Sequence, residues 1–373
     1  MVKAGVVSRA RAEIVGLCHA GLDSITLRRR VLKVLQRVVP VDAVWWATVD
    51  PAILLFTSAV REDLPEKTTP LFVENEFLQN DSNKFTDLCA NVLVRSLSEA
   101  TRGDLSKSQR YREILVPLGL ADELRAVLKL GSCCWSFLCL HREPSQVYFS
   151  KNEAAFLRQL GPHLAEGVRA SFLLAAAEAS DEDAGPGLIL LSDDFSMIGK
   201  TPAAEQWMAY LRPEEWSRQS ELPQAVYAVA ARVRALESTH EGIPLIPRLR
   251  LKTASGKWLV LHASRLSGGM QNSPIAVIIE HPTPLELAPL IVEAYGLSPR
   301  ERMVTQLVLQ GLSTREIVDR LFISANTVQD HLKAVFDKMG VRSRRELSAH
   351  ILGRHYLRRA KAHNPIAPSG YFR

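Results

Sequence analysis

The sequence predicts a multidomain protein, with two mixed α/β domains followed by an all-α domain of four helices. Two stretches that break regular structure divide the 373-residue chain. Strand and helix patterns alternate in the first two parts, whereas the third part has only helical patterns. The breaks are EASDEDAGPG, residues 178–187, and HPTPLELAP, residues 281–289. We therefore expect domains over residues 1–178, 186–281 and 290–373.

The composition is that of a soluble globular protein, with 47% hydrophobic and 23% charged residues. No apolar run reaches the roughly 18 residues that a membrane span needs. Charges interrupt the first apolar stretch before a signal-peptide core can form. The five cysteines are odd in number, which favours reduced thiols over a disulfide framework. We expect a cytoplasmic protein that has no membrane partner.

The first domain combines helical and strand patterns. An amphipathic helix is expected over residues 24–39, a strand over 41–50, and further strand structure over 126–142. Ser150 and Glu153 have the spacing of a capping box and begin a long helix. This order resembles a GAF-type sensory domain. The resemblance implies an antiparallel sheet flanked by helices, with terminal helices that pair in a dimer.

The second domain has a similar mixture. Over residues 188–208 it reads as a strand, an Asp-rich turn, a short strand and a helix that begins near Pro202. Two later strands meet at a turn at Ser255 and Gly256, and a third follows a Gly-rich link. The run Asp193–Glu205 resembles the opening of a PAS domain. That resemblance implies a second antiparallel sheet flanked by helices.

Start and stop signals divide the third domain into four helices. The capping and stop residues, in chain order, are Ser298, Gly311, Ser313, Ser324 and Gly340. The fourth helix is expected to begin at Arg344. A short helix, a tight turn and a longer helix with polar residues at its start form the layout of a helix-turn-helix.

The longest of these helices has two contrasting faces. Its apolar stripe, which a core would bury, consists of Val328, Leu332, Val335, Phe336 and Met339. The last fifth of the chain is also basic, with 14 Lys and Arg against 6 Asp and Glu from residue 296 onward, which favours nucleic acid as a partner. Hydrogen-bonding side chains near the helix start are therefore expected to face base edges: Asn326, Gln329, Asp330 and Lys333.

This module resembles the LuxR-type DNA-binding domain, also called GerE or NarL-type. The matching residues are Ser298-Pro299-Arg300-Glu301, Gly311-Leu312-Ser313, Glu316-Ile317, Leu321, Ser324, Thr327-Val328, His331, Lys338 and Gly340-Val341. The resemblance implies a dimer, formed with help from the fourth helix, that reads an inverted repeat. Gln329 departs from the lysine usual in the family, and Gln prefers adenine. Phosphate contacts are expected from Arg315, Thr327, Lys338 and Arg344.

Short motifs in the first two domains suggest other ligand chemistries. Residues 83–87, NKFTD, resemble elements of cyclic-nucleotide-binding GAF domains, but those elements are contiguous here and a helix start also explains them. Cys133, Cys134 and Cys139 form either a thiol sensor or a set of buried structural thiols, whereas a local disulfide or zinc site is not expected from their spacing. Haem ligation by His240 or His262 is a further hypothesis.

Catalytic motifs are missing from the sequence. Residues 199–201, GKT, imitate the end of a phosphate-binding loop, but Asp194 stands where that loop requires its first glycine. No nucleophile elbow, zinc-binding HExxH helix or paired CxxC occurs. We therefore expect no enzyme activity, cofactor or metal.

These patterns predict a bacterial-type, one-component transcriptional regulator. The sensory N-terminal domains would modulate the binding of the helix-turn-helix to promoter DNA. Its expected partners are double-stranded DNA, a second copy of the chain, an unidentified small-molecule ligand and RNA polymerase. Two competing hypotheses stay open: a protein-interaction scaffold that docks proteins through the helix-turn-helix-like unit, and a sensor-domain enzyme with unrecognised chemistry.

Overall fold

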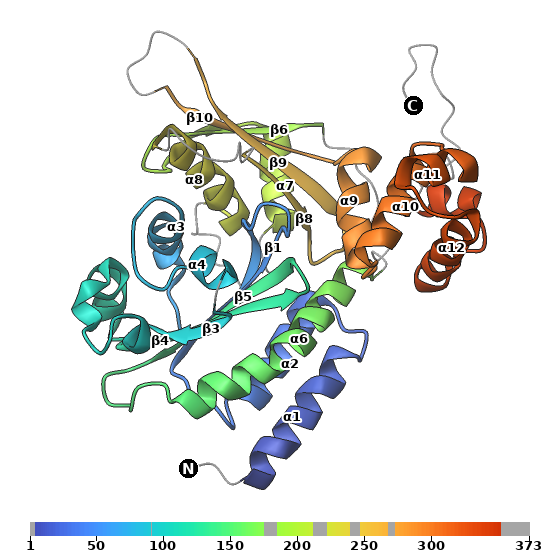
Figure 1. The fold of residues 1–373 in the computed structure, drawn as a ribbon. Coiled ribbons are helices and arrows are strands. Elements are labelled where there is room, and N and C mark those ends of the chain that lie inside the picture. Colours follow the sequence, from blue (N-terminus) through green and yellow to red (C-terminus); the bar gives the residue numbers. More distant parts are fainter. Residues whose placement is uncertain are drawn as a thin grey trace. The chain divides into compact units, whose positions relative to one another are not determined.

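The structure is a computed structural model, in which residues 4–90, 92–174, 185–211, 222–238, 247–267 and 273–351 are described. The chain forms two compact units, Met1–His281 and Pro282–Arg373, here called unit 1 and unit 2 (Figure 1). No helix in the described ranges is long and apolar enough to cross a membrane.

The first half of unit 1 is a five-stranded sheet flanked by helices (Figure 1). Its strand order is β2-β1-β5-β4-β3, and each neighbouring pair is antiparallel. The strands are β1 (Ala43–Val49), β2 (Phe56–Glu62), β3 (Val94–Ser96), β4 (Asp122–Leu130) and β5 (Cys133–Arg142). The helices are α1 (Ala4–Cys18), α2 (Ser24–Leu35), α3 (Thr69–Phe77), α4 (Phe85–Ala90), α5 (Leu97–Ala100) and α6 (Lys151–Leu173). Short helical turns are η1 (Glu66–Thr68), η2 (Leu105–Lys107), η3 (Tyr111–Leu115) and η4 (Val116–Leu118).

The long helix α6 begins where the sequence predicts. The Glu153 N–H donates to Ser150 Oγ, and the Ser150 N–H donates to the Glu153 carboxylate at 2.8 Å, which completes the capping box. Helices α1 and α2 pack against α6, and α6 also contacts β4. The predicted helix over residues 24–39 and the predicted strand over 41–50 are confirmed as α2 and β1.

The second half of unit 1 contains another antiparallel sheet, ordered β7-β6-β10-β9-β8. Both sheets thus place their own strands in the order second, first, fifth, fourth, third. The strands are β6 (Gly187–Leu191), β7 (Met197–Lys200), β8 (Arg248–Lys252), β9 (Trp258–Arg265) and β10 (Ile275–Glu280), and the helices are α7 (Pro202–Leu211) and α8 (Gln224–Ser238). The predicted strands and the helix at Pro202 are confirmed.

Helix α8 joins the two sheets into one core. It contacts α3 and β2 in the first half, and β9 and β10 in the second. One cluster of buried apolar side chains includes Phe56, Val229 of α8 and Leu261. Arg250 also pairs with the buried Asp50, with Nη2 2.7 Å from Oδ1. The predicted boundary at residue 178 lies outside the described residues.

Gly187 is the first residue of β6 and packs closely against α7. A Cβ at this position would lie 2.6 Å from the Ala204 Cα and 2.9 Å from the Trp207 Cδ1, which is closer than real Cβ contacts. We expect Gly187→Ala to lower the free energy of unfolding by about 2 kcal/mol in urea denaturation, because the packed backbone must shift. Gly199→Ala on β7 is the matched control, since its Cβ would meet nothing within 4 Å. Equal losses would contradict the steric explanation.

Unit 2 is built from helices joined by short turns in its described part. These are α9 (Pro284–Ala294), α10 (Pro299–Leu309), α11 (Thr314–Leu321) and α12 (Ala325–Met339), followed by helical residues 344–351. The four helices expected in the third domain are confirmed as α10, α11, α12 and the helical residues 344–351, and α9 precedes them. The cluster that they bury includes Val304, Ile317, Val328, Leu332 and Leu347.

Helix α9 corrects one expectation. The prolines of residues 281–289 were expected to break regular structure, but α9 begins among them. Thr283 and Glu286 form a capping box there. Pro284 occupies the first helical position, where the missing N–H costs no helical hydrogen bond.

Candidate nucleic-acid interface

Local capping chemistry sets the relation between α11 and α12. Ser313 and Glu316 form a capping box at the start of α11. Phe322 then takes a left-handed conformation, with φ of 54°, which turns the chain sharply after α11. Ser324 caps α12 by accepting from the Thr327 N–H at 3.1 Å, and Gly340, with φ of 64°, ends it. The predicted helix-turn-helix is therefore confirmed.

The apolar face of α12 lies in the core of unit 2, as its spacing predicts. Val328 and Val335 are fully buried, and Leu332 and Met339 nearly so. Phe336 is half-buried and packs against the same cluster. This packing fixes which side of α12 faces outward.

The opposite face of α12 carries the four residues expected to read bases. The positions Asn326, Gln329, Asp330 and Lys333 are separated by three, one and three residues, so they share one helix face. All four are exposed, and none of their side chains has a hydrogen bond or ion pair within the described residues. Their donors and acceptors are therefore available to a partner.

The residues expected to contact phosphates differ in their surroundings. Arg315 is exposed in the first turn of α11, and the Thr327 hydroxyl lies 2.8 Å from the Ser324 hydroxyl. The Lys338 Nζ pairs with Glu301 at 2.6 Å. Arg344 donates to the Leu312 carbonyl at 3.0 Å and to the Thr314 hydroxyl at 2.8 Å, which ties the last helix to the start of α11.

Two glutamates of the family pattern hold the module together. Burial alone would raise the pKa of Glu301, but bonds from Lys338 and Ser298 outweigh it and keep the pKa below its usual value. Bonds from the Ser313 hydroxyl and N–H lower the pKa of Glu316. Both carboxylates therefore stay ionised at neutral pH and serve as helix caps.

Sequence reasoning missed Phe322. Its side chain is 92% exposed, although it belongs to the turn that introduces α12. A signal was present in the sequence, because Phe322 falls outside the apolar stripes of both α11 and α12. An exposed aromatic ring in the turn before α12 adds an apolar contact point to the surface.

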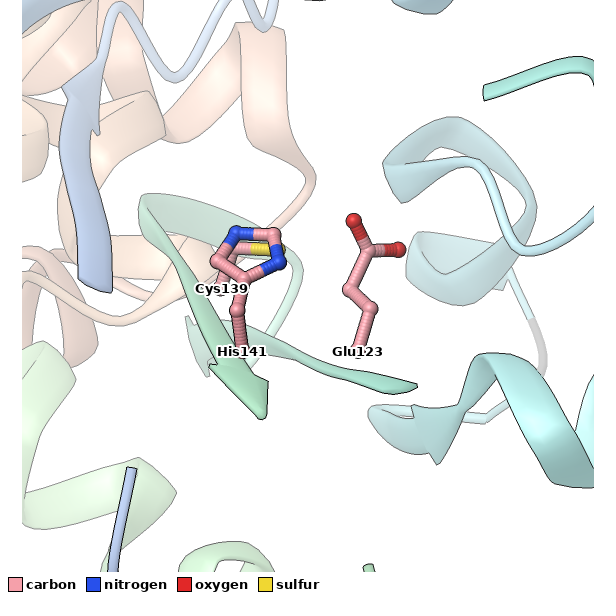
Figure 2. Close-up of side chains that lie close together, drawn as sticks. All are labelled: Glu123, Cys139 and His141. Carbon is pink, nitrogen blue, oxygen red and sulfur yellow. The ribbon is translucent and has the colours of Figure 1, made fainter. Parts of the chain in front are cut away.

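A buried group of potential metal ligands lies on the first sheet of unit 1 (Figure 2). Glu123 on β4 is paired across the sheet with His141 on β5, and their ligand atoms and the Cys139 Sγ lie within 4.8 Å of one another. However, the Glu123 carboxylate accepts from Arg110 at 2.8 and 3.1 Å and pairs with Arg125 at 2.8 Å. Two guanidinium groups at this distance disfavour a metal cation.

The nucleotide, haem and thiol hypotheses for unit 1 gain no support from its geometry. Asn83 exchanges hydrogen bonds with Arg95, and Phe85 begins α4, so a helix start accounts for residues 83–87. His262 lies 3.6 Å from Glu280, and His240 lies outside the described residues. Burial raises the pKa of Cys134 and Cys139, which keeps both as thiols.

Comparisons with known proteins agree on unit 2. The model of the luxR family of bacterial regulatory proteins, GerE, matches residues 296–351. A protein named as an HTH-type transcriptional regulator in Mycobacterium bovis is 51% identical over 52 residues, which are 14% of this chain and 6% of that relative's length.

A solved GAF domain/HD domain protein from Geobacter sulfurreducens aligns with 41% of this chain and 97% of its own, at 18% identity and a TM-score of 0.32.

The spore germination protein GerE of Bacillus subtilis is 39% identical over 56 residues, which are 15% of this chain and 76% of GerE. The residues that the family model matches, 296–351, contain the capped helices α10 to α12 and the helical residues that follow. This coverage of about three quarters of a small relative, at 39% identity and with the helix-turn-helix in place, shows that the chain belongs to the luxR family of bacterial regulatory proteins.

Proposed function

We propose that this protein is a DNA-binding transcriptional regulator in which α12 reads the major groove. The observation that carries the proposal is the contrast between the two faces of α12. One face is buried in unit 2, and the other presents Asn326, Gln329, Asp330 and Lys333 without internal partners among the described residues. A groove about 12 Å wide admits one helix and displays donors and acceptors on base edges.

The base-facing side chains suit different bases. Gln329 and Asn326 can pair with adenine through two hydrogen bonds, Asp330 can accept from the amino group of cytosine, and Lys333 can donate to guanine. Arg315, Thr327, Lys338 and Arg344 contact the DNA phosphates. These contacts position the helix on the DNA without reading its sequence. The internal bonds of Lys338 and Arg344 orient these two cations before DNA arrives.

The proposal extends to assembly and control. The protein acts in the cytoplasm as a homodimer on an inverted repeat, and contacts RNA polymerase at the promoter. The GAF-like and PAS-like domains of unit 1 modulate DNA binding when a small molecule binds two of their arrangements unequally. One relative is named a spore germination protein, GerE, and another is named an HTH-type transcriptional regulator. Both names support this function.

Salt dependence tests the DNA contacts. We expect the full-length protein to bind a selected duplex with a log-log salt slope of about −5, since three cations in each of two protomers each release about 0.9 counterion. Arg315→Ala should reduce this slope by about 2 for a dimer and weaken all sequences alike. Lys333→Ala should instead relax the preference at one base step by about 1–3 kcal/mol. Fluorescence anisotropy with selected and scrambled duplexes at several salt concentrations measures both effects.

Arg30→Ala is the matched control, because it removes an exposed arginine from α2 of unit 1. It should leave the slope and the sequence preference unchanged. A flat salt response in the wild-type protein, or identical behaviour of Arg315→Ala and Lys333→Ala, would contradict the proposed division of roles.

A further inference from the structure

Two cysteines that are far apart in the sequence lie in contact beside the first sheet of unit 1. Cys89 belongs to the last turn of α4, and Cys134 lies on β5. Both pack in the same apolar cluster, in which Cys134 is buried and Cys89 is half-buried. A hydrogen bond joins their side chains, and neither takes part in a disulfide. The thiol hypothesis for residues 133–139 did not include Cys89.

A β-bulge in β5 places Cys134 on the face of the sheet that α4 covers. The register between β4 and β5 passes over Trp135, so that Lys129 pairs with Cys134. One extra residue reverses the alternation of side chains along a strand, which brings Cys134 to the same face as Phe137. Phe137 stacks on Phe85 of α4, with ring centroids 4.4 Å apart. The position of Cys134 beside α4 therefore follows from the strand register.

The two thiols differ in acidity. The hydrogen bond from Cys134 lowers the pKa of Cys89, burial opposes that change, and the net pKa lies below its usual value. The charge of Lys129 lowers this pKa further, against the smaller effect of Glu76. The Lys129 Nζ also donates to the Cys89 carbonyl at 3.2 Å, which holds the ammonium group beside the end of α4. Because the thiolate is the reactive form, Cys89 is the better nucleophile of the pair.

The two thiols also differ in access to solvent. Cys134 is 3% exposed, and burial raises its pKa, so it remains a thiol. Cys89 keeps part of its surface in contact with solvent. Burial also raises the pKa of Cys18 to about 12 and the pKa of Cys139 above its usual value, so neither competes as a nucleophile. A small oxidant therefore reacts first at Cys89, where a second thiol is already in contact.

We infer that Cys89 and Cys134 form a reversible thiol pair that a hydroperoxide oxidises to a disulfide. The Cys89 thiolate attacks the terminal oxygen of the hydroperoxide and becomes a sulfenic acid. The O–O bond breaks, and the alkoxide that leaves takes up a proton and becomes an alcohol, or water when the oxidant is hydrogen peroxide. The Cys134 sulfur then attacks the sulfenic sulfur, the S–O bond breaks, and hydroxide leaves with the Cys134 proton as water. Two thiols have lost two hydrogens, and the hydroperoxide has taken up both electrons.

Disulfide formation changes the packing of α4. Two bonded sulfur atoms lie about 2.05 Å apart, which is closer than any hydrogen-bonded contact between two thiols. The end of α4 must therefore move toward β5 when the bond forms, which gives unit 1 a reduced and an oxidised arrangement. The use of this change as the input of the regulator rests on the proposed function, whereas disulfide formation does not.

Peptide mapping of the full-length protein tests the pair. The reduced protein is treated with hydrogen peroxide or cumene hydroperoxide, the remaining thiols are alkylated, and the protein is digested with trypsin without reductant. We expect a cross-link between peptides 85–95 and 130–142, and dithiothreitol should remove it. Peptide 130–142 holds Cys133, Cys134 and Cys139, so fragment ions must assign the bond to Cys134.

Serine variants separate the two chemical steps. Cys134→Ser should form no disulfide and should leave a sulfenic acid on Cys89 that dimedone traps. Serine keeps a donor for the Ser136 carbonyl, which lies 3.7 Å from the Cys134 Sγ. Cys89→Ser should give neither the disulfide nor a dimedone adduct on Cys134. Cys133→Ser is the matched control, because it removes a half-buried thiol next to Cys134, and it should form the disulfide like the wild type.

The map of the wild-type protein decides the inference even if a serine variant does not fold. No cross-link under excess hydroperoxide, or a cross-link through Cys133 or Cys139, would overturn it. DNA affinity is measured on the reduced and oxidised samples, and oxidation should change it at least about fivefold in the wild type but not in Cys89→Ser. An unchanged affinity would overturn the input role alone. Disulfide formation in a protein that binds no DNA in either state would overturn the proposed function alone.

Discussion

Replacing Arg110 with Met is expected to lower the free energy of unfolding of unit 1 by about 3–5 kcal/mol. Arg110 is 0% exposed. It donates to both carboxylate oxygens of Glu123, at 2.8 and 3.1 Å, and to the Asn75 Oδ1 at 2.8 Å. Its Nη1 also lies 3.6 Å from the buried carboxylate of Asp81. Methionine keeps the length of the side chain but leaves two buried carboxylates short of their partner.

The effect is large because the neighbours of Arg110 are buried, so water cannot replace the hydrogen bonds that Arg110 donates to them. Glu123 is itself fully buried, and Arg110 and Arg125 outweigh its desolvation and lower its pKa to about 2. Arg125 already pairs with Glu76 at 2.7 Å, so it cannot replace both hydrogen bonds that Arg110 gives to Glu123. The carboxylate must then stay charged with fewer donors or take up a proton.

Urea denaturation followed by tryptophan fluorescence measures this loss, because all six tryptophans of the chain precede residue 282. Arg37→Met is the matched control. The Arg37–Glu13 pair has a similar length, 2.9 Å, but its side chains are 57% and 47% exposed. An exposed pair contributes at most about 1 kcal/mol. If both variants lost the same stability, burial would not be the cause.

The sequence predicts unit 2 well because its signals are local. Each cap acts within three residues, as Ser313 and Glu316 illustrate, and the stripe of α12 repeats with the helical period. The same kind of signal was available for α9, where Thr283 and Glu286 have capping-box spacing, but the prolines masked it. The bounds of these helices are therefore written in local sequence, without reference to distant segments.

Features of unit 1 that depend on packing between distant segments could not be predicted. Helix α8 is rich in alanine and valine and contacts strands of both sheets. Its residues 225–231 are all buried, so this part of the helix has no polar face that would reveal the helical period. Glu123 and His141 meet because of the register of β4 against β5, which no sequence spacing records. Likewise, nothing in the run Arg28–Arg30 shows that Arg28 alone of the three is fully buried.

Acid sensitivity of unit 1 between pH 6.5 and 4 is the second large effect that we expect. Burial lowers the pKa of His141 from 6.5 to about 4; the Glu123 charge opposes this shift, and Arg125 and Arg110 add to it. As the pH falls through this window, the unfolded chain takes up a proton at His141 while the folded protein does not. Stability therefore decreases by about 3 kcal/mol.

His141→Leu should remove this decrease. Neither ring nitrogen of His141 has a hydrogen-bond partner within the described residues, so leucine leaves no acceptor or donor stranded and should cost little at pH 7. Tryptophan-detected urea denaturation at intervals from pH 7 to pH 4 measures the difference between the two proteins. His19→Gln, which removes an exposed imidazole, is the matched control and should follow the wild type.

The two titrating groups of this network can be separated by pH. The pKa of Glu123 is lowered from 4.5 to about 2 in the folded protein, so its contribution is fully present above pH 4.5 and is lost only as the pH falls from 4.5 toward 2. His141→Leu should therefore flatten the curve above pH 4.5 and leave a steep fall below it. If the free energy of unfolding of His141→Leu fell with pH between 6.5 and 4.5 as steeply as that of the wild type, His141 would have to be protonated in the folded protein. The buried network would then carry one more positive charge than the geometry implies.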